Sequence, residues 1–403
     1  MEKKTKILIV TSGVFAVPAV KGGSIETLVT NLLDVNEIKK KYEFFVGSCF
    51  DEAAYESSKK YHFSKFIYYK KNHKFNFAYK IWALIYYFMR FFHVDIPKFH
   101  YTWEVYQAIK KEKIDFVIIE EGDAWAHNFL MKKIGRDKMI YHSHSELNAE
   151  RNFEKNYDYV VTCSKHIEEL NFKNSQKYDM KKFVLLNCIN ENKFLKKTST
   201  EQKIDLRKSL SIPNEDIVFL FVGRIAWDKG VLELIEAWEK SKLSNAKLLI
   251  VGSALLNHKT LTEYEKKVKE ALNKSKNIIS LGFIPQNDLY KYYQISNVFV
   301  APSYREPAGL MNIEAMFSGL PIISTNQGGV MEYIINRRNG ILISEYNAID
   351  ELVEVIREMY SNQELREKMT DNNLNDRFKF TTDKYYENFD RIIQSIQKNK
   401  IKK

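Results

Sequence analysis

Short apolar segments alternate with longer helical patterns from one end of the chain to the other. Such alternation is typical of doubly wound parallel sheets, because each parallel strand needs a crossover helix before the next. In the first half we expect strands at Ile7–Val10, Phe44–Gly47, Phe116–Ile119, Met139–His142, Tyr159–Cys163 and Phe183–Leu186. In the second half we expect them at Val218–Val222, Lys247–Val251, Ile278–Leu281, Val298–Ala301, Pro321–Ser324 and Gly340–Ile343. The predicted fold class is therefore α/β.

The length of the chain, 403 residues, predicts two domains, because a single hydrophobic core rarely grows so large. Between the two series of strands the stretch 187–216 is polar and shows little periodicity, which favours a linker near 190–211. We predict an N-terminal domain over residues 1–195 and a C-terminal domain over residues 196–380. Residues 381–403, a last helix and a lysine-rich tail, are expected to pack back towards the N-terminal domain.

Apart from its charge, the composition is that of an ordinary globular protein, with 45% hydrophobic and 28% charged residues. The cysteines show no metal-ligand or CxxC spacing, which favours small buried side chains in a reducing compartment. They are Cys49, Cys163 and Cys188. No apolar signal core follows the first lysines. We therefore expect a cytoplasmic protein, peripheral at most on the inner face of the cell membrane.

The formal net charge of +11 favours acidic partners, such as phosphorylated substrates, anionic lipid or nucleic acid. Many basic residues lie in the stretch 59–113, interleaved with aromatic residues that gather over 66–92. The apolar run Ile81–Met89 within it is too short to span a bilayer. Two interpretations stay open: a basic aromatic helix on an anionic membrane surface, or aromatic core residues with solvated lysines. No recognisable nucleic-acid-binding module accompanies the charge.

Glycine and histidine residues follow the predicted strands of the first half, at the edge where open α/β sheets bind ligands. Gly22 and Gly23 precede a helical pattern, and two glycines there let backbone N–H groups approach an anion. The alternative is a turn that needs glycine for steric reasons, and the spacing matches neither a dinucleotide fingerprint nor a P-loop. His142 and His144 follow the fourth expected strand. Such a pair also suggests a metal site, but the sequence shows no third ligand.

In the second half two carboxylates lie close to a predicted helix start. Pro302 ends an apolar strand, Glu306 lies in the following loop, a helix opens near Gly309 and Leu310, and Glu314 lies inside it. The unpaired N–H groups and positive dipole end of a helix start suit a phosphate, whereas carboxylates suit hydroxyl donors. The pattern therefore favours a ligand that combines a phosphate with a polyol, as a nucleotide sugar does. The alternative is a helix with two solvated glutamates.

Two cations flank a short loop after the first strand of the second half. They are Arg224, directly after Gly223, and Lys229. A guanidinium fork and an ammonium group suit a diphosphate leaving group, because negative charge grows there as a glycosidic bond breaks. The alternative is one surface arginine and one lysine at a helix end.

Together these segments resemble the family 4 (group 1) retaining glycosyltransferases of the GT-B fold, of the type that builds bacterial surface polysaccharide. The resemblance covers the second half nearly throughout and the first half more loosely. In the second half it rests on Phe221–Arg224 with Lys229-Gly230, Leu249–Gly252, Leu281–Pro285, the E-x7-E stretch from Pro302 to Pro321, and Asn326–Glu332. In the first half it rests on Gly22–Glu26, Val160–Ser164 and Leu186–Phe194. The GT-B fold implies two Rossmann-like domains that face each other across a cleft.

The resemblance implies a donor diphosphate site made from both halves. The backbone at Gly22 and Gly23 would hold the diphosphate together with Arg224 and Lys229, and Gly223 would lie in the same site. Arg224 and Lys229 would be catalytic as well as binding residues. No cofactor and no metal ion is expected, since the nucleotide sugar is a substrate and this family typically needs no metal.

The resemblance also implies how the remaining donor groups are held. Glu306 would bind hydroxyl groups of the donor sugar and take part in catalysis, whereas Glu314 would bind the ribose. Gly309 and Leu310 would donate N–H groups from the helix start.

The family histidine that ends a strand of the first domain aligns best with His144, and His142 lies one strand repeat away. The resemblance implies that it orients the donor and stabilises charge near the anomeric carbon. Two departures bear on specificity. Ala308 stands where the family often has phenylalanine, so the donor sugar is not inferred, and Cys188 and Asn190 replace a glycine and an aspartate.

We therefore predict a retaining hexosyl- or N-acetylhexosaminyltransferase that uses a nucleotide-diphosphate sugar, with UDP-sugars favoured. The predicted acceptor is lipid-linked glycan or polysaccharide in capsule or O-antigen assembly, at an anionic membrane surface and without nucleic acid. Two alternatives stay open. One is a nucleotide-sugar epimerase of the same fold; the other is a non-catalytic basic protein that binds membrane or nucleic acid.

Overall fold

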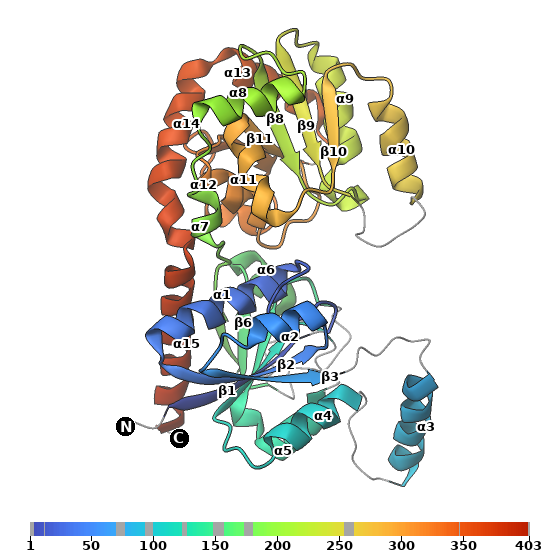
Figure 1. Ribbon diagram of the computed structural model, residues 1–403, viewed down its shortest axis with the longest axis vertical. Coiled ribbons are helices and arrows are strands. Elements are labelled where there is room, and N and C mark those ends of the chain that lie inside the picture. Colours follow the sequence, from blue (N-terminus) through green and yellow to red (C-terminus); the bar gives the residue numbers. More distant parts are fainter. Residues whose placement is uncertain are drawn as a thin grey trace. The chain divides into compact units, whose positions relative to one another are not determined.

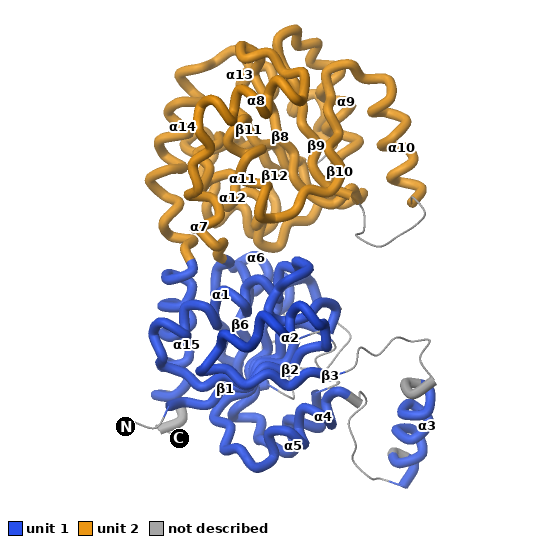
Figure 2. The backbone as a smooth tube through the Cα atoms, in the orientation of Figure 1, with its two compact units in different colours: residues 1–187, 382–403 blue, residues 188–381 orange. Residues whose placement is uncertain are grey.

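The computed structural model describes residues 4–11, 13–69, 77–92, 100–122, 127–147, 157–172, 180–253, 262–345 and 347–401. The chain divides into two compact units (Figure 2). Unit 1 comprises residues 1–187 and 382–403, and unit 2 comprises residues 188–381. The sequence placed the divisions at 195/196 and 380/381. The first division lies earlier because Phe194 packs within unit 2, with its ring centroid 5.8 Å from that of Tyr293.

Unit 1 is built on a parallel sheet of seven strands (Figure 1). The strands are β1 (Thr5–Thr11), β2 (Tyr42–Cys49), β3 (Ser64–Tyr69), β4 (Phe116–Glu120), β5 (Met139–Ser143), β6 (Tyr159–Thr162) and β7 (Lys181–Val184). Their order is β3-β2-β1-β4-β5-β6-β7, so the direction of strand addition reverses between β1 and β4. Doubly wound sheets bind ligands beyond the carboxyl ends of the strands at such a reversal.

Helices cover both faces of this sheet. The helices of unit 1 are α1 (Ser24–Lys39), α2 (Glu52–Ser58), α3 (Phe77–Phe91), α4 (His100–Ile109), α5 (Asn128–Ile134), the 3-10 turn Arg136–Lys138, α6 (Lys165–Phe172) and α15 (Thr382–Ile401), and α3 is not among those that cover the sheet (Figure 1). On one face Val117 belongs to the same core cluster as Val105 of α4 and Leu130 of α5. On the other face Ile140 lies near Ile393 of α15. Helix α15 also packs against α1, which ties the end of the chain to unit 1.

Unit 2 repeats this plan with six parallel strands. They are β8 (Ile217–Val222), β9 (Ala246–Val251), β10 (Ile278–Gly282), β11 (Val298–Ala301), β12 (Ile322–Thr325) and β13 (Gly340–Ile343). The order β10-β9-β8-β11-β12-β13 reverses between β8 and β11. The residues that follow β8 and β11 therefore meet at the ligand-binding edge.

Both faces of the second sheet are covered too. Its helices are α7 (Glu191–Phe194), α8 (Thr200–Ser209), α9 (Val231–Ser241), α10 (Glu263–Leu272), α11 (Gln286–Ile295), α12 (Leu310–Phe317), α13 (Ile349–Ser361) and α14 (Gln363–Asp376), with 3-10 turns at Trp227–Lys229, Gly328–Glu332 and Arg377–Phe380. Phe219 packs edge-on against Trp238 of α9, with ring centroids 5.3 Å apart. On the opposite face Phe299 of β11 packs against Tyr293 of α11, with ring centroids 5.8 Å apart.

Two sequence expectations differ from the fold. The expected linker contains the helices α7 and α8, so the prediction of a linker near 190–211 was wrong there. Helix α8 has no buried side chain and is held by polar contacts: Ser199 and Gln202 form a capping box, and Arg207 Nη2 donates to the Ile295 carbonyl at 2.9 Å. Strand β3 was not expected, because this edge strand lies in the stretch interpreted as an aromatic and basic region.

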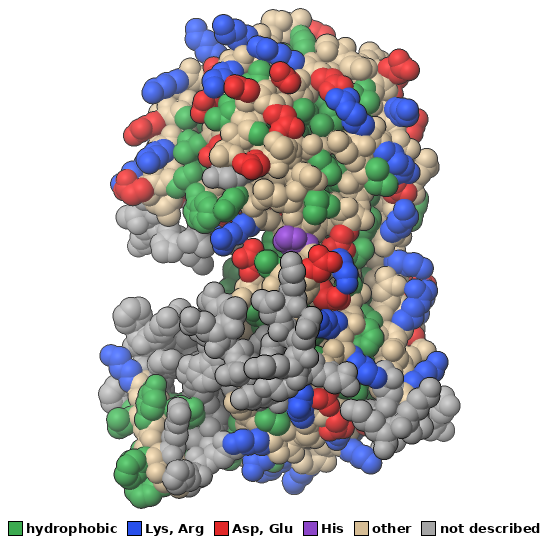
Figure 3. Space-filling view, turned by 180° about the vertical axis from the view of Figure 1, so that it is seen from behind, with side chains coloured by type: hydrophobic (Ala, Val, Ile, Leu, Met, Phe, Trp, Pro, Cys, Tyr) green, Lys and Arg blue, Asp and Glu red, His purple; other side chains and the backbone are tan. Residues whose placement is uncertain are grey.

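That region separates into two structural parts. Strand β3 belongs to the sheet and ends in the buried Tyr69, whereas α3 carries large apolar side chains in solvent. Leu84, Phe88 and Phe91 are 73%, 62% and 79% exposed, and their spacing places them along one side of the helix. Figure 3 shows apolar side chains gathered on this helix at the lower left. In the described part of the chain, no helix is both long and apolar enough to cross a bilayer.

Candidate functional site

The predicted site residues of unit 2 lie at the edge where its strand order reverses. Gly223 and Arg224 follow β8, and the loop that carries Glu306 follows β11. The ends of β8 and β9 come unusually close there. A Cβ atom on Gly252 would lie 1.7 Å from the carbonyl oxygen of Gly223, so this position cannot carry a side chain without moving the backbone. The edge is thus built from closely packed backbone.

Lys229 and Glu306, which are far apart in the sequence, form the centre of this edge. Lys229 Nζ lies 2.8 Å from Glu306 Oε2 and donates to the carbonyl of Arg305 at 3.1 Å. The second carboxylate oxygen, Glu306 Oε1, accepts the N–H of Gly309 at 3.1 Å. Both ionic side chains are 15% exposed. The ion pair therefore holds an ammonium group and a carboxylate in fixed positions directly before the start of α12.

Glycine is required in the backbone around Glu306. Gly309 has φ +65°, and a Cβ atom there would lie 2.2 Å from the hydroxyl oxygen of Tyr333. That hydroxyl donates to the carbonyls of Ala308 and Gly309 at 3.1 and 3.0 Å. A Cβ atom on Gly328 would lie 2.1 Å from the Glu306 carbonyl oxygen, which accepts the N–H of Gly329 at 3.0 Å. These contacts fix the loop that presents Glu306.

Arg224 is more exposed than Lys229. Its side chain is 60% exposed, and Nη2 lies 3.3 Å from Asp228 Oδ2. The backbone carbonyl of Asp228 accepts the N–H of Tyr304 at 2.9 Å, which ties the loop after β8 to the loop after β11. Asp228 was not among the predicted site residues. It forms part of the predicted Arg224–Lys229 loop, but the sequence did not show that its side chain pairs with the guanidinium.

Glu314 lies within α12 and is buried, with 6% of its surface exposed. The hydroxyl of Tyr293 donates to Glu314 Oε2 at 2.9 Å. Burial raises the pKa of Glu314 to about 7, against the hydrogen bond from Tyr293, which lowers it. Glu314 is thus a sequestered carboxylate and not a solvated one. Tyr293 was missed by the sequence analysis, since an aromatic residue in a helix carries no sign of a distant partner.

Helix α12 begins at Leu310, directly after Gly309. Its first N–H groups have no acceptor within the helix and lie at the positive end of the helix dipole. Lys229 is held near this helix start through Glu306, which also binds Gly309. The unit 2 edge therefore combines a cation, a helix start and a carboxylate, the groups that a phosphate and a polyol need.

The predicted residues of unit 1 lie at the reversal between β1 and β4. Gly22 and Gly23 have φ of +84° and +97°, a backbone conformation that favours glycine. Glu26, three residues after Gly23, is only 3% exposed, and Oε1 accepts the N–H of Phe15 at 3.3 Å. Burial raises the pKa of this carboxyl group above its ordinary value. The glycine turn therefore wraps around a buried acid.

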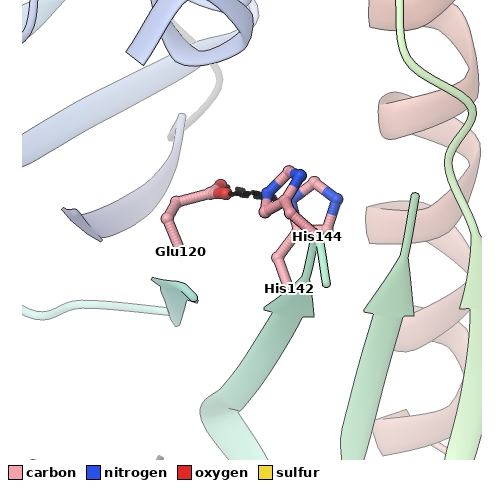
Figure 4. Close-up of side chains that lie close together, drawn as sticks. All are labelled: Glu120, His142 and His144. Atoms are coloured by element: carbon pink, nitrogen blue, oxygen red, sulfur yellow. Dashed lines mark hydrogen bonds and ion pairs between the residues drawn. The ribbon is translucent and has the colours of Figure 1, made fainter. Parts of the chain in front are cut away.

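His142 and His144 converge on a residue that the sequence analysis did not select. Glu120, the last residue of β4, lies with Oε2 2.8 Å from His144 Nε2 and 3.1 Å from His142 Nδ1 (Figure 4). Burial favours neutral forms: it lowers the pKa of His142. Burial also acts to raise the pKa of Glu120, but the interactions with the two imidazoles outweigh it and hold that pKa below its usual range. The third ligand that the sequence did not show is therefore supplied by the neighbouring strand.

The residue after Glu120 fixes the same loop. Glu121 has φ 61°, uncommon for a residue with a side chain, and its carboxylate accepts the backbone N–H of His144 and the hydroxyl of Ser145. Two consecutive glutamates thus hold His144, one through its ring and one through its backbone. No sequence motif marked Glu120 or Glu121, because their partners lie on another strand.

Comparison with known proteins gives a family match for unit 2. Residues 202–376 match the family "Glycosyl transferases group 1". An uncharacterized glycosyltransferase of Methanocaldococcus jannaschii is 32% identical over 218 residues, 53% of this chain and 55% of that protein. A capsular polysaccharide biosynthesis glycosyltransferase of Staphylococcus aureus is 32% identical over 167 residues, 40% of each chain. The sequence match thus spans about half of these relatives or less.

The fold is shared over a longer part of the chain. The crystal structure of an Anabaena protein, HepE, in complex with UDP-glucose superposes with a TM-score of 0.71 and 18% identity. That likeness covers 97% of this chain and 99% of the Anabaena chain. With the two parallel sheets, this likeness shows that the chain has the GT-B fold, and residues 202–376 carry the match to the group 1 glycosyltransferase family.

Proposed function

We propose that this protein is a retaining glycosyltransferase that transfers a sugar from a nucleotide-diphosphate sugar. The single observation that carries the proposal is the joined arrangement of Lys229, Glu306 and Gly309 at the strand-order reversal of unit 2. It offers a cation, a hydroxyl acceptor and a helix start within one hydrogen-bonded group. The match of residues 202–376 to the group 1 glycosyltransferases supports the same reaction type.

In this mechanism the cations of unit 2 stabilise the departing diphosphate. Two of the three N–H donors of Lys229 are used by the described oxygens of Glu306 and Arg305, which orients the third for a phosphate oxygen. Arg224 is exposed and can bring its guanidinium fork to the same group. Because negative charge on the diphosphate grows as the glycosidic bond breaks, these contacts strengthen in the transition state.

Glu306 and Glu314 take separate roles in the proposal. Glu306 accepts hydroxyl groups of the sugar while its other oxygen stays on the N–H of Gly309. Glu314 accepts the ribose hydroxyls, which favour its ionised form. UDP is the nucleotide we favour, and the UDP-glucose complex of the structurally similar Anabaena protein supports it.

We infer retention of anomeric configuration through front-face attack, in which the departing phosphate oxygen accepts the proton of the acceptor. The carboxylates described at the unit 2 edge support this mechanism over a covalent one. Glu306 is paired with Lys229 and Asp228 with Arg224, and an ion-paired carboxylate is a weak nucleophile. His144 of unit 1 is proposed to orient the donor near the anomeric carbon.

The proposed acceptor is a lipid-linked glycan or a polysaccharide, with the protein peripheral on an anionic membrane. The exposed apolar side of α3 supports this, because Leu84, Phe88 and Phe91 can enter the headgroup region. The helix has 15 residues, too few to span a bilayer. The similarity to a capsular polysaccharide glycosyltransferase supports a polymer product.

A donor panel tests the proposed function. The purified chain is mixed with UDP-, GDP- and TDP-sugars, and thermal shift and release of nucleoside diphosphate are measured. We expect one nucleotide class to raise the melting temperature and to be turned over, slowly without acceptor and faster with it. Conversion of the sugar without acceptor, with no diphosphate release, would instead identify an epimerase. No shift with any donor would contradict the proposal.

A further inference from the structure

The buried group Glu120, His142 and His144 has the composition of a metal-binding site. One donor atom from each residue lies within 4.8 Å of the other two. Figure 4 shows the carboxylate of Glu120 pointing at both imidazole rings. Two imidazoles and a carboxylate are a ligand set that suits zinc and related divalent ions.

The fold brings these three side chains together. Glu120 ends β4 and is paired in register with His142 of β5, while His144 follows two residues later. His142 lies in β5 and His144 directly beyond its end, and both imidazoles reach the same carboxylate. The donor separations of 2.8 and 3.1 Å are close to the roughly 3.3 Å between tetrahedral zinc ligands at about 2.0 Å from the metal. The nitrogen donors of the two histidines lie within 4.8 Å of each other, so one ion can be reached by all three residues after a side-chain adjustment.

The charges around this group favour a cation. Glu120 is 5% exposed and Glu26 is 3% exposed, and Glu26 lies near enough to interact electrostatically with Glu120 and with His144. Among the described residues, the ion pairs of Glu120 are those with the two histidines, and no lysine or arginine ion pair is found for Glu26. Two buried carboxylates thus face two imidazoles without a permanent positive charge. A divalent cation would offset the cost of burying them.

We propose that Glu120, His142 and His144 bind one divalent transition-metal ion, with zinc preferred over magnesium or calcium. The imidazole ligands set this preference, because magnesium and calcium favour oxygen ligands. Three protein ligands leave a fourth position for water or a substrate oxygen. The inference does not depend on the proposed transferase activity. It departs from the sequence-based expectation of no metal, which rested on the lack of a third ligand in the sequence and on the resemblance to a family that typically needs no metal.

Metal binding would change which nitrogen of each imidazole carries the proton. The nitrogens that now face Glu120 become metal ligands, and in a neutral ring the proton moves to the opposite nitrogen. For His142 that nitrogen is Nε2, which is buried and has no hydrogen-bond partner in the described part of the chain. An unsatisfied buried donor weakens binding. We therefore expect a site that an excess of chelator can empty, and not a permanently occupied one.

Metal titration of the untagged full-length chain tests the proposal. After treatment with EDTA and its removal, Zn²⁺ is titrated by calorimetry, and Co²⁺ is added separately to follow visible absorption. We expect one equivalent of Zn²⁺ per chain, the intense visible bands of a tetrahedral Co²⁺ site, and no comparable heat with Mg²⁺. UDP binding is measured on the same samples, so loss of metal binding is distinguished from failure of the donor site.

Variants identify the ligands. Glu120→Gln and His144→Asn should each lower Zn²⁺ affinity at least tenfold, whereas His62→Asn, at a histidine whose side chain is 79% exposed, should leave it unchanged. Circular dichroism and thermal unfolding show whether each variant is folded; if Glu120→Gln does not fold, His144→Asn and the Co²⁺ spectrum of the parent still decide. The absence of stoichiometric Zn²⁺ binding in the parent, or equal binding in both ligand variants, would overturn the proposal and leave a hydrogen-bonded triad.

Discussion

The two units present the same kind of sheet edge with different chemistry. In both, a turn with glycine follows the first strand, and a glutamate lies at the end of the strand on the other side of the order reversal or beyond it. In unit 2 the glutamate is Glu306, paired with Lys229, and both side chains are 15% exposed. In unit 1 it is Glu120, 6% exposed at its side chain and paired with His142 and His144, at 3% and 9%.

This difference indicates which ligands each edge can accept. A permanent cation next to a half-buried carboxylate can exchange part of its contact for a phosphate and a hydroxyl group, so the unit 2 edge suits an anionic polyol. A deeply buried carboxylate between imidazoles has no such spare positive charge and suits a cation instead. The same sheet topology thus presents an edge suited to an anion in unit 2 and an edge suited to a cation in unit 1. Variants of each edge test this distinction.

The largest expected effect is on turnover when the cation of unit 2 is removed. Lys229→Ala should raise the activation free energy of donor turnover by roughly 2–4 kcal/mol, because the lost contact strengthens as the diphosphate departs. Arg224→Ala should cost less, because that side chain is more exposed. Steady-state kinetics with saturating donor measure both.

The matched control for these variants is Lys240→Ala, at a lysine on α9 that pairs with Glu236 at the surface of unit 2. It should keep the parent turnover. Parent-like turnover in both Lys229→Ala and Arg224→Ala would contradict the assignment of the donor diphosphate to the unit 2 edge.

A smaller effect is expected on stability, through the buried Glu314. Its pKa of about 7 lies above the ordinary value, so its protonated form is favoured by folding. The stability that this contributes is complete below the unfolded pKa and is lost as pH rises through about 7. Between pH 5 and pH 8 the free energy of unfolding of the parent should therefore fall by up to about 3 kcal/mol more than that of Glu314→Gln. Denaturant unfolding of both proteins at each pH measures this difference.

The same experiment can contradict the assignment of Glu314 as a sequestered acid. A stability difference between parent and Glu314→Gln that does not change with pH would show that Glu314 titrates normally. The burial assigned to Glu314 would then be wrong, and its proposed role as a ribose acceptor would depend on UDP binding alone.

The third expected effect concerns membrane binding and leaves turnover unchanged. The parent should sediment with vesicles rich in phosphatidylglycerol, and Leu84→Glu combined with Phe88→Glu should release it, because charged side chains do not enter the headgroup region favourably. Phe283→Glu, at a residue of unit 2 that is 55% exposed, is the matched control and should stay bound. A parent that stays in the supernatant at low and high salt would refute the membrane surface proposed for α3.

Much of this could be predicted from the sequence, for identifiable reasons. Each strand with a compact apolar core pattern was expected. Strand β3 was not, because the sequence of this edge strand, SKFIYY, resembles the aromatic and basic stretch around it. The loops of unit 2 were expected from the family resemblance, and the structure explains two of their glycines. A Cβ atom would meet the Tyr333 hydroxyl at Gly309 and the Glu306 carbonyl oxygen at Gly328.

The contacts between strands could not be predicted in the same way. Asp228, Tyr293 and Glu120 acquire their roles only through partners on other elements. Helix α8 was missed because it is anchored by Arg207 and a capping box and not by an apolar face. The sequence thus showed where each sheet edge lies and which groups unit 2 supplies, but not how the groups of unit 1 combine.

The central claim is that the unit 2 edge binds the nucleoside diphosphate of a sugar donor, and calorimetric titration with UDP tests it most directly. The parent should bind UDP. Glu314→Gln should bind it roughly ten- to a hundredfold more weakly, because a charged hydrogen bond to the ribose is lost. Glu306→Gln should bind UDP nearly as the parent does but should lose sugar transfer. If UDP binds Glu306→Gln poorly and Glu314→Gln normally, the two roles are reversed. If the parent binds neither UDP nor any other nucleoside diphosphate, the central claim is contradicted.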